Sequence, residues 1–190
     1  QNVYQEIESL QESKGAIKGV RSGFSALDNK IIQMGKGDLI IVGARPGMGK
    51  TSFAMNIATN VARRAQKDVV TFNLEMSSDQ LATRILSTES LVESNALRSG
   101  RISAEDWVKL ATSAGYLSTL PLYIDDTASM TVQQMKAKLR RVKNLGLVII
   151  DYLQLMDSSS KSDNRVVVIS EITRQIKVMA KELLLQEMRI

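Results

Sequence analysis

The chain has 190 residues and a mass of 21.0 kDa, which suits one domain with its own apolar core. No apolar run approaches the roughly 20 residues that a membrane-spanning helix needs, so a transmembrane protein is excluded. Cysteine and histidine are both absent, which excludes disulfides, thiolate metal sites and histidine-based catalytic triads. The lack of cysteine is compatible with the reducing cytoplasm, where we expect the protein. The net charge of +5 favours a polyanionic partner only weakly.

The start of the chain indicates part of a longer protein. It begins at Gln1 instead of Met and shows no signal-peptide pattern. Residues 2–13 have an amphipathic pattern that predicts a helix. This helix either covers its own domain or docks on a neighbouring subunit, because residues 15–23 are typical of a flexible connector. We therefore divide the chain into a linker helix at 1–14 and a domain at 15–190.

Four short apolar runs alternate with helical patterns along the domain. They lie at residues 39–43, 69–74, 122–124 and 147–150. Continuous apolar runs are typical of strands that are buried on both faces of a parallel sheet, with helices between them. The sequence therefore predicts an α/β fold with a mostly parallel central sheet flanked by helices.

The helical patterns carry apolar stripes and N-terminal caps. Ser77 with Gln80 matches a capping box, and Ser103 is in the position of a cap for the next helix. The stripes, which we expect to face the core, consist of Phe53, Ile57 and Val61; Leu81 and Ile85; Trp107, Leu110, Ala114 and Leu117; and Val132, Met135, Leu139 and Val142.

The stretch "ARPGMGKT", residues 44–51, matches the P-loop or Walker A pattern, except that alanine replaces its first glycine. Gly47 and Gly49 permit backbone angles that turn successive N–H groups toward anionic oxygens. Lys50 adds a positive charge for the β and γ phosphates, and the Thr51 hydroxyl can ligate Mg²⁺. The candidate nucleotide-binding residues are Ala44, Arg45, Pro46, Gly47, Met48, Gly49, Lys50, Thr51 and Ser52.

Two acidic residues follow apolar runs and are candidates for the chemistry. Mg²⁺ bound to phosphates usually needs a carboxylate at the end of a buried strand, and Asp151 is in that position. The alternative is that Asp151 only caps a turn. Hydrolysis also needs a base to deprotonate water, and Glu75 ends another run at the same edge of the expected sheet. Asp125 and Asp126 are its competitors.

These motifs resemble the C-terminal motor domain of the bacterial replicative DNA helicase of the DnaB type, a RecA-like P-loop NTPase. The resemblance covers about residues 1–183 and is most specific in "FNLEMSSDQLATRIL" and "VIIDYLQLM". It implies a RecA-like ATPase that uses ATP and Mg²⁺ and forms a hexameric ring around single-stranded DNA. It also implies ATP hydrolysis at subunit interfaces, translocation from 5′ to 3′, unwinding at the replication fork, and primase and helicase-loader partners.

The resemblance also implies roles for individual residues. Lys50 and Thr51 correspond to the phosphate and magnesium contacts, Glu75 to the catalytic glutamate, and Asp151 to the aspartate of the second nucleotide-binding motif. The linker helix would pack on the adjacent subunit. The predicted catalytic residues are therefore Glu75 and Lys50, and the predicted metal ligands are Thr51 and Asp151.

The DNA contacts are less defined. In the family, loops that face the central pore carry them, which makes Lys161 and Arg165 candidates, although a solvated polar loop is the alternative. Lys136, Arg140 and Lys143 lie opposite an apolar stripe and either contact DNA or form a solvated helix face.

The end of the chain departs from the family pattern. The family continues beyond Leu183 with a glutamine that senses the γ phosphate and an arginine finger, and we assign neither role to Gln186 or Arg189. We therefore expect the 190-residue chain to bind nucleotide but to hydrolyse it slowly. A RecA-type recombinase or clock ATPase, and a nucleotide-stabilised ring module without hydrolysis, are the alternative functions.

Overall fold

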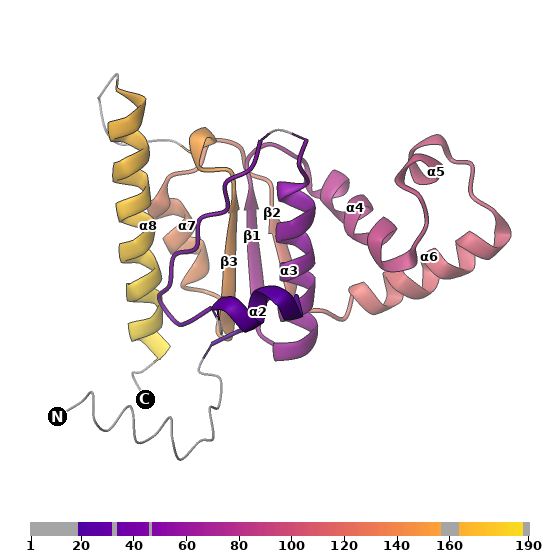
Figure 1. Ribbon diagram of the computed structural model, residues 1–190, viewed down its shortest axis with the longest axis horizontal. Coiled ribbons are helices and arrows are strands. Elements are labelled where there is room, and N and C mark those ends of the chain that lie inside the picture. The colour runs from indigo at the N-terminus through magenta and orange to yellow at the C-terminus, as the bar shows by residue number, and fades with distance from the viewer. Residues whose placement is uncertain (1–18, 32–33, 46, 157–163, 188–190) are drawn as a thin grey trace, which may run out of the picture.

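A computed structural model of the chain describes residues 19–31, 34–45, 47–156 and 164–187, which form a layered α/β domain (Figure 1). The predicted linker helix, Pro46 of the P-loop and Lys161 lie outside the described residues. Within the described part, no helix combines the length and apolar character that crossing a membrane requires. The elements are α2 (Ser25–Ile31), α3 (Lys50–Ala65), β1 (Asp68–Asn73), α4 (Ser78–Ser90), α5 (Ser94–Ser99), α6 (Ala104–Leu117), β2 (Leu122–Asp125), α7 (Val132–Leu139), β3 (Leu145–Asp151), the 3-10 helix η1 (Leu153–Leu155) and α8 (Arg165–Glu187).

The sheet consists of three parallel strands in the order β2-β1-β3. Val70 of β1 pairs with Tyr123 of β2 and with Val148 of β3, and Asn73 pairs with Asp151 at the end of β3. Three of the four predicted strands and their parallel arrangement are therefore confirmed. Because the strands are parallel, their carboxyl ends lie together at the upper edge of the sheet in Figure 1.

Helices cover both faces of the sheet, and alternate residues of each strand point to opposite faces. Val70 and Phe72 of β1 pack in a core cluster with α7 and α8. Val69 packs on the other face in a cluster with α3. Odd-numbered residues of β1 therefore face α3. Asn73, the last residue of the strand, is one of them.

The apolar stripes form most of this core, as predicted. Ile57, Leu81, Leu110, Met135 and Leu139 are all buried. The capping box of Ser77 and Gln80 is present, and the Ser103 hydroxyl accepts a hydrogen bond from the backbone N–H of Asp106.

Two stripe residues of α6 are placed differently from the prediction. The helix α6 packs mainly on α4, and of its stripe residues Leu110 is buried, whereas Trp107 is 59% exposed and Ala114 is exposed as well. Together α4, α5 and α6 project away from the sheet (Figure 1). Arg63 of α3 connects this projection to the core, since its guanidinium binds Glu89 of α4 at 2.5 Å and lies over the Tyr116 ring of α6 at 5.2 Å.

The predicted strand at 39–43 is wrong for the structure described here. Residues 38–45 have no strand pairing and run beside α8 toward the P-loop (Figure 1), and Ile41 is 65% exposed. An apolar run indicates a tendency to be buried, but a strand also needs a backbone partner in register. The segment is held at its start instead, where Lys177 of α8 donates a hydrogen bond to the Gly37 carbonyl at 2.7 Å.

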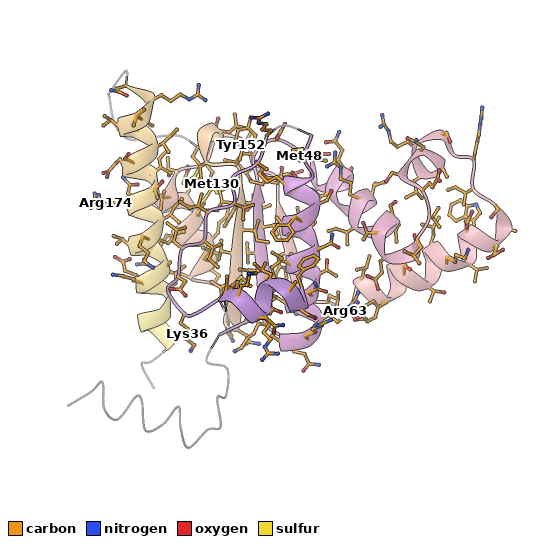
Figure 2. All side chains as sticks on the ribbon, in the orientation of Figure 1. Lys36, Met48, Arg63, Met130, Tyr152 and Arg174 are labelled. Atoms are coloured by element: carbon orange, nitrogen blue, oxygen red, sulfur yellow. The ribbon has the colours of Figure 1, made fainter. Side chains whose placement is uncertain are left out.

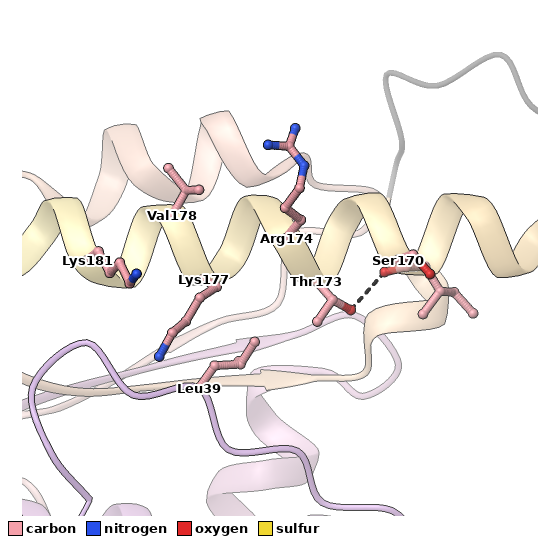
Figure 3. A pocket seen from close by; sticks show the side chains of 8 residues that line it. Leu39, Ser170, Thr173, Arg174, Lys177, Val178 and Lys181 are labelled. Carbon is pink, nitrogen blue, oxygen red and sulfur yellow. Dashed lines mark hydrogen bonds between the residues drawn. The ribbon is translucent and has the colours of Figure 1, made fainter.

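A groove of about 580 Å³ lies between this segment and α8 (Figure 3). Leu39 forms one wall, and residues from Ile169 to Lys181 on α8 form the other. The groove includes none of the P-loop residues and neither candidate acid, so it is not the site to which the motifs point.

The core cluster between the sheet and α7 allows a direct test of the fold. Leu139 is 1% exposed and Leu91 is 89% exposed. We expect Leu139→Ala to lower the free energy of unfolding by about 2–5 kcal/mol, because it leaves a cavity among closely packed side chains. The same change at Leu91 should cost less than about 0.5 kcal/mol. Urea unfolding followed by circular dichroism measures both, and equal losses would contradict the packing described here.

Candidate functional site

The P-loop lies at the carboxyl edge of the sheet and leads directly into α3. Gly47 and Gly49 have φ angles of 78° and 82°, in the left-handed region that favours glycine. A Cβ atom at either position would meet no atom within 4 Å, so backbone conformation and not space selects glycine there. Gly49 offers no side-chain cap, and the N–H groups of the first turn of α3 are therefore available to an anion.

Asp151 contacts this first turn from the end of β3. Its side chain is 6% exposed, and the Nζ atom of Lys50 lies 2.8 Å from its Oδ1 atom. The Thr51 hydroxyl donates a hydrogen bond to the other carboxylate oxygen at 2.6 Å. A buried carboxylate is tolerated only with such partners. Because both oxygens bind α3, the alternative that Asp151 merely caps a turn loses its support.

Thr51 and Asp151 together offer oxygen ligands for a hard cation. A hydroxyl and a carboxylate oxygen within 2.6 Å of each other fit the ligand types that Mg²⁺ takes from proteins. Among the described residues, no cluster of three or more acidic side chains could hold a metal by itself. A cation at this position would therefore take its remaining ligands from water and from an anionic ligand.

Tyr152 is a member of the site that the sequence analysis missed. The Nζ atom of Lys50 lies 4.4 Å from the centroid of the Tyr152 ring, a distance typical of a cation–π contact. Figure 2 labels Tyr152 and Met48, which both lie toward the upper end of the sheet in that view. The available signals were that Tyr152 directly follows Asp151 and lies in the family-specific stretch "VIIDYLQLM".

The sequence predicted Glu75 at the end of a strand, but in the structure it lies two residues beyond the end of β1. The strand ends at Asn73, and Glu75 is exposed in the turn that leads to α4. The Oδ1 atom of Asn73 accepts hydrogen bonds from the backbone N–H groups of Glu75 at 3.3 Å and of Met76 at 2.7 Å. Asn73 therefore fixes the backbone that carries Glu75, and the sequence analysis did not single it out.

The two competing acids are both engaged elsewhere. Burial raises the pKa of Asp125, but the hydrogen bonds from Lys138 at 2.5 Å and from Thr127 together lower it by more. The pKa of Asp125 is therefore below its ordinary value. The backbone N–H of Ser78, at 2.7 Å, holds the pKa of Asp126 below its ordinary value. A general base with a lowered pKa is weak at neutral pH, and β1 separates β2 from Asp151. The geometry therefore favours Glu75.

The candidate DNA contacts remain apart from this cluster. Arg165 is exposed at the first position of α8. Lys136 forms an ion pair with Glu182 of α8, which favours a structural role for it. Arg140 is the exposed C-cap of α7 and keeps a helical conformation, with its backbone N–H bonded to the Lys136 carbonyl, whereas Lys143 lies beyond the helix.

Comparison with known proteins places this arrangement in a family. The family model described as "DnaB-like helicase C terminal domain" matches residues 19–186. The chain belongs to the DnaB-like helicase C-terminal domain family. Two solved structures are similar to this family member at a TM-score of 0.86 and 34% identity, each over 96% of the chain. One is described as "The Structure Of A DnaB-Like Replicative Helicase And Its Interactions With Primase", and the chain covers 44% of it. The other is described as an ATPase domain, and the chain covers 65% of it.

Curated relatives of this DnaB-like domain are similar over most of its length. The replicative DNA helicase DnaC of Bacillus subtilis and the replicative DNA helicase DnaB of Geobacillus stearothermophilus are each 46% identical over 184 residues, which is 95% of the chain. The chain spans 40% of the length of each. The RecA-like fold class expected from the resemblance is therefore confirmed.

The contact of Lys50 with Tyr152 predicts a spectroscopic signature. Protons near the Lys50 Nζ atom lie over the aromatic ring, so their NMR resonances should be shifted upfield by the ring current. We expect Tyr152→Phe to preserve the shift and Tyr152→Leu to abolish it. Lys109 on α6, which pairs with Glu105, is the internal reference because neither variant should move its resonances. An unchanged Lys50 shift in Tyr152→Leu would contradict the contact.

Proposed function

We propose that this domain is the ATP-dependent motor of a replicative DNA helicase. One observation carries the proposal: the Asp151 carboxylate lies between Lys50 and Thr51 at the start of α3, directly after the P-loop. Cationic, hydroxyl and carboxylate groups therefore meet where free backbone N–H groups face outward. This combination suits a nucleoside triphosphate with Mg²⁺, and the family membership supports ATP as that nucleotide.

Each group has a defined task in nucleotide binding. The backbone N–H groups of Gly47 and of residues 49–52 bind phosphate oxygens, aided by the positive end of the α3 dipole, whereas that of Met48 bonds to the Arg45 carbonyl. Lys50 exchanges its contact with Asp151 for the β and γ phosphates, and Tyr152 keeps the ammonium group near the loop during that exchange. Thr51 and Asp151 would hold Mg²⁺, which when bound neutralises part of the phosphate charge.

Glu75 is the proposed general base. Its carboxylate follows β1, the strand next to the one that carries Asp151, and the Asn73 side chain fixes the turn before it. In hydrolysis the carboxylate would accept a proton from the water that attacks the γ phosphorus atom, and the bond from this phosphorus to the oxygen that bridges it to the β phosphate breaks, so that ADP leaves. Lys50 would stabilise the negative charge that develops on the phosphate oxygens.

The relatives suggest what this hydrolysis would drive. Proteins 46% identical to the chain are named replicative DNA helicases, and one similar structure is described together with its interactions with primase. We propose a hexameric ring that encircles single-stranded DNA in the cytoplasm and moves from 5′ to 3′ at the replication fork. Primase and a helicase loader are the proposed protein partners, and Lys161 and Arg165 are the proposed DNA contacts.

Two variants separate binding from hydrolysis. Lys50→Ala should lower the affinity for ATP by about 10- to 100-fold, because it removes a charged hydrogen bond to phosphate. Glu75→Gln should leave that affinity unchanged and lower turnover by about 10²- to 10⁴-fold in the assembled protein with DNA. Fluorescent-nucleotide titration and phosphate release measure the two quantities. Lys109→Ala and Glu105→Gln on α6 are matched controls, and normal turnover in Glu75→Gln would remove the base from the mechanism.

Unwinding of a forked duplex distinguishes the proposed motor from its alternatives. We expect strand separation that needs ATP, Mg²⁺ and a free 5′ single-stranded arm, and that is lost in Lys50→Ala. Strand exchange between homologous duplexes would instead support a recombinase. A nucleotide-stabilised module would be supported by two results together. The wild-type protein would unwind no fork, and Glu75→Gln would still assemble into a ring.

A further inference from the structure

Asn73 uses only half of its side-chain amide in the contacts described above. It is 1% exposed at the end of β1, and its Oδ1 atom accepts two backbone N–H groups from the turn that carries Glu75. These two donors fix the orientation of the amide, because a flipped side chain would place N–H groups against N–H groups. The Nδ2 atom is therefore on the side away from the turn.

This Nδ2 atom has no hydrogen-bond partner. It is the one buried side-chain nitrogen or oxygen atom in that condition among the residues that the structure describes. Buried polar groups are nearly always paired, so an orphaned donor needs a specific explanation. A donor aimed into a ligand site is satisfied when the ligand is bound.

The fold places Asn73 on the floor of the P-loop site. Val69 faces α3, and side chains alternate along a strand, so Asn73 lies on the α3 face as well. Its register partner on β3 is Asp151, and neighbouring strands are about 4.8 Å apart. Asp151 in turn contacts Lys50 and Thr51 on the first turn of α3. The unpaired donor and the proposed metal-binding carboxylate are therefore neighbours under the same helix end.

We propose that the Nδ2 group of Asn73 donates a hydrogen bond to a ligand oxygen beside Asp151, and so links the bound nucleotide to the turn that carries Glu75. This inference rests on the proposed function, because it needs a nucleotide in the site. The acceptor is an anionic or strongly polarised oxygen, supplied either by the γ phosphate or by a water held between cation and phosphate. One buried amide then contacts the ligand with its nitrogen and holds the Glu75 backbone with its oxygen.

The test removes the donor and keeps the acceptor. In Asn73→Ser, the hydroxyl can still accept the N–H groups of residues two and three positions ahead, but it is too short to reach the position of Nδ2. Asn73→Asp keeps the acceptor and replaces the donor with a negative oxygen. Thr71→Val is the matched control, since Thr71 is buried on the same face of β1 and its hydroxyl bonds to the Tyr123 carbonyl instead.

The two acceptors predict different results in nucleotide titrations. If the γ phosphate is the acceptor, Asn73→Ser should weaken binding of a non-hydrolysable ATP analogue by about 10- to 100-fold and leave ADP unchanged. If the acceptor is a water bound to the cation, Asn73→Ser should weaken the binding of both nucleotides equally in the presence of Mg²⁺. In EDTA, its affinity for either nucleotide should equal that of the wild type. In both cases Asn73→Asp should bind more weakly than Asn73→Ser, and Thr71→Val should match the wild type.

Further measurements separate this contact from a purely structural role. The backbone amide resonances of Glu75 and Met76 in the nucleotide-free protein should be unchanged in Asn73→Ser, which shows that the turn is intact. Normal affinity of Asn73→Ser for both nucleotides would overturn the inference, as would a loss accompanied by displaced resonances of these two amides. The proposed function has its own criterion, because it fails if wild type and Lys50→Ala bind nucleotide equally. If Lys50→Ala weakens binding and Asn73→Ser does not, the inference alone fails.

Discussion

The buried carboxylate of Asp151 and its two partners on α3 organise the functional edge of this domain. The hydrogen bond from Thr51 joins residues 100 positions apart in the sequence. A buried carboxylate without partners is strongly destabilising, and the first turn of α3 provides the ammonium group of Lys50 and the hydroxyl of Thr51 within hydrogen-bond distance. This contact seats the start of α3 over the end of β3, and it therefore places the P-loop where both strand ends can reach a ligand.

The acidic residues at this edge are divided between structure and chemistry by their hydrogen bonds. Asp126 anchors the start of α4 through the N–H of Ser78, and Asp125 binds Lys138 at the end of α7. Asp151 is paired with Lys50, whereas Glu75 is exposed on a turn held by Asn73. These contacts agree with the proposed division of roles, in which Asp151 holds a cation and Glu75 acts as the base. The structural acids hold the helices that frame them.

Much of this could be predicted from local sequence because its causes are local. The glycines of the P-loop, the capping box at Ser77 and the stripe that ends at Leu139 each depend on residues within a few positions of one another. The strand at 39–43 was predicted by the same reasoning and is wrong, since pairing depends on a partner elsewhere in the chain. Trp107 matched an apolar stripe, but it is exposed because α6 lies in the part of the fold that projects from the sheet (Figure 1) and packs mainly on α4.

The sequence by itself determined the type of ligand, because a glycine loop with lysine and threonine at the start of a helix suits phosphate whatever the rest of the chain does. It also determined that Asp151 needed a partner, since its position after an apolar run made burial certain to be costly. Only the tertiary structure decided which groups meet there. The order β2-β1-β3 sets Asn73 beside Asp151 and leaves Asp125 and Asp126 one strand further away. The contact of Tyr152 with Lys50 of α3 and the position of Asn73 beside Asp151 likewise join segments that are far apart in the sequence, which no local pattern records.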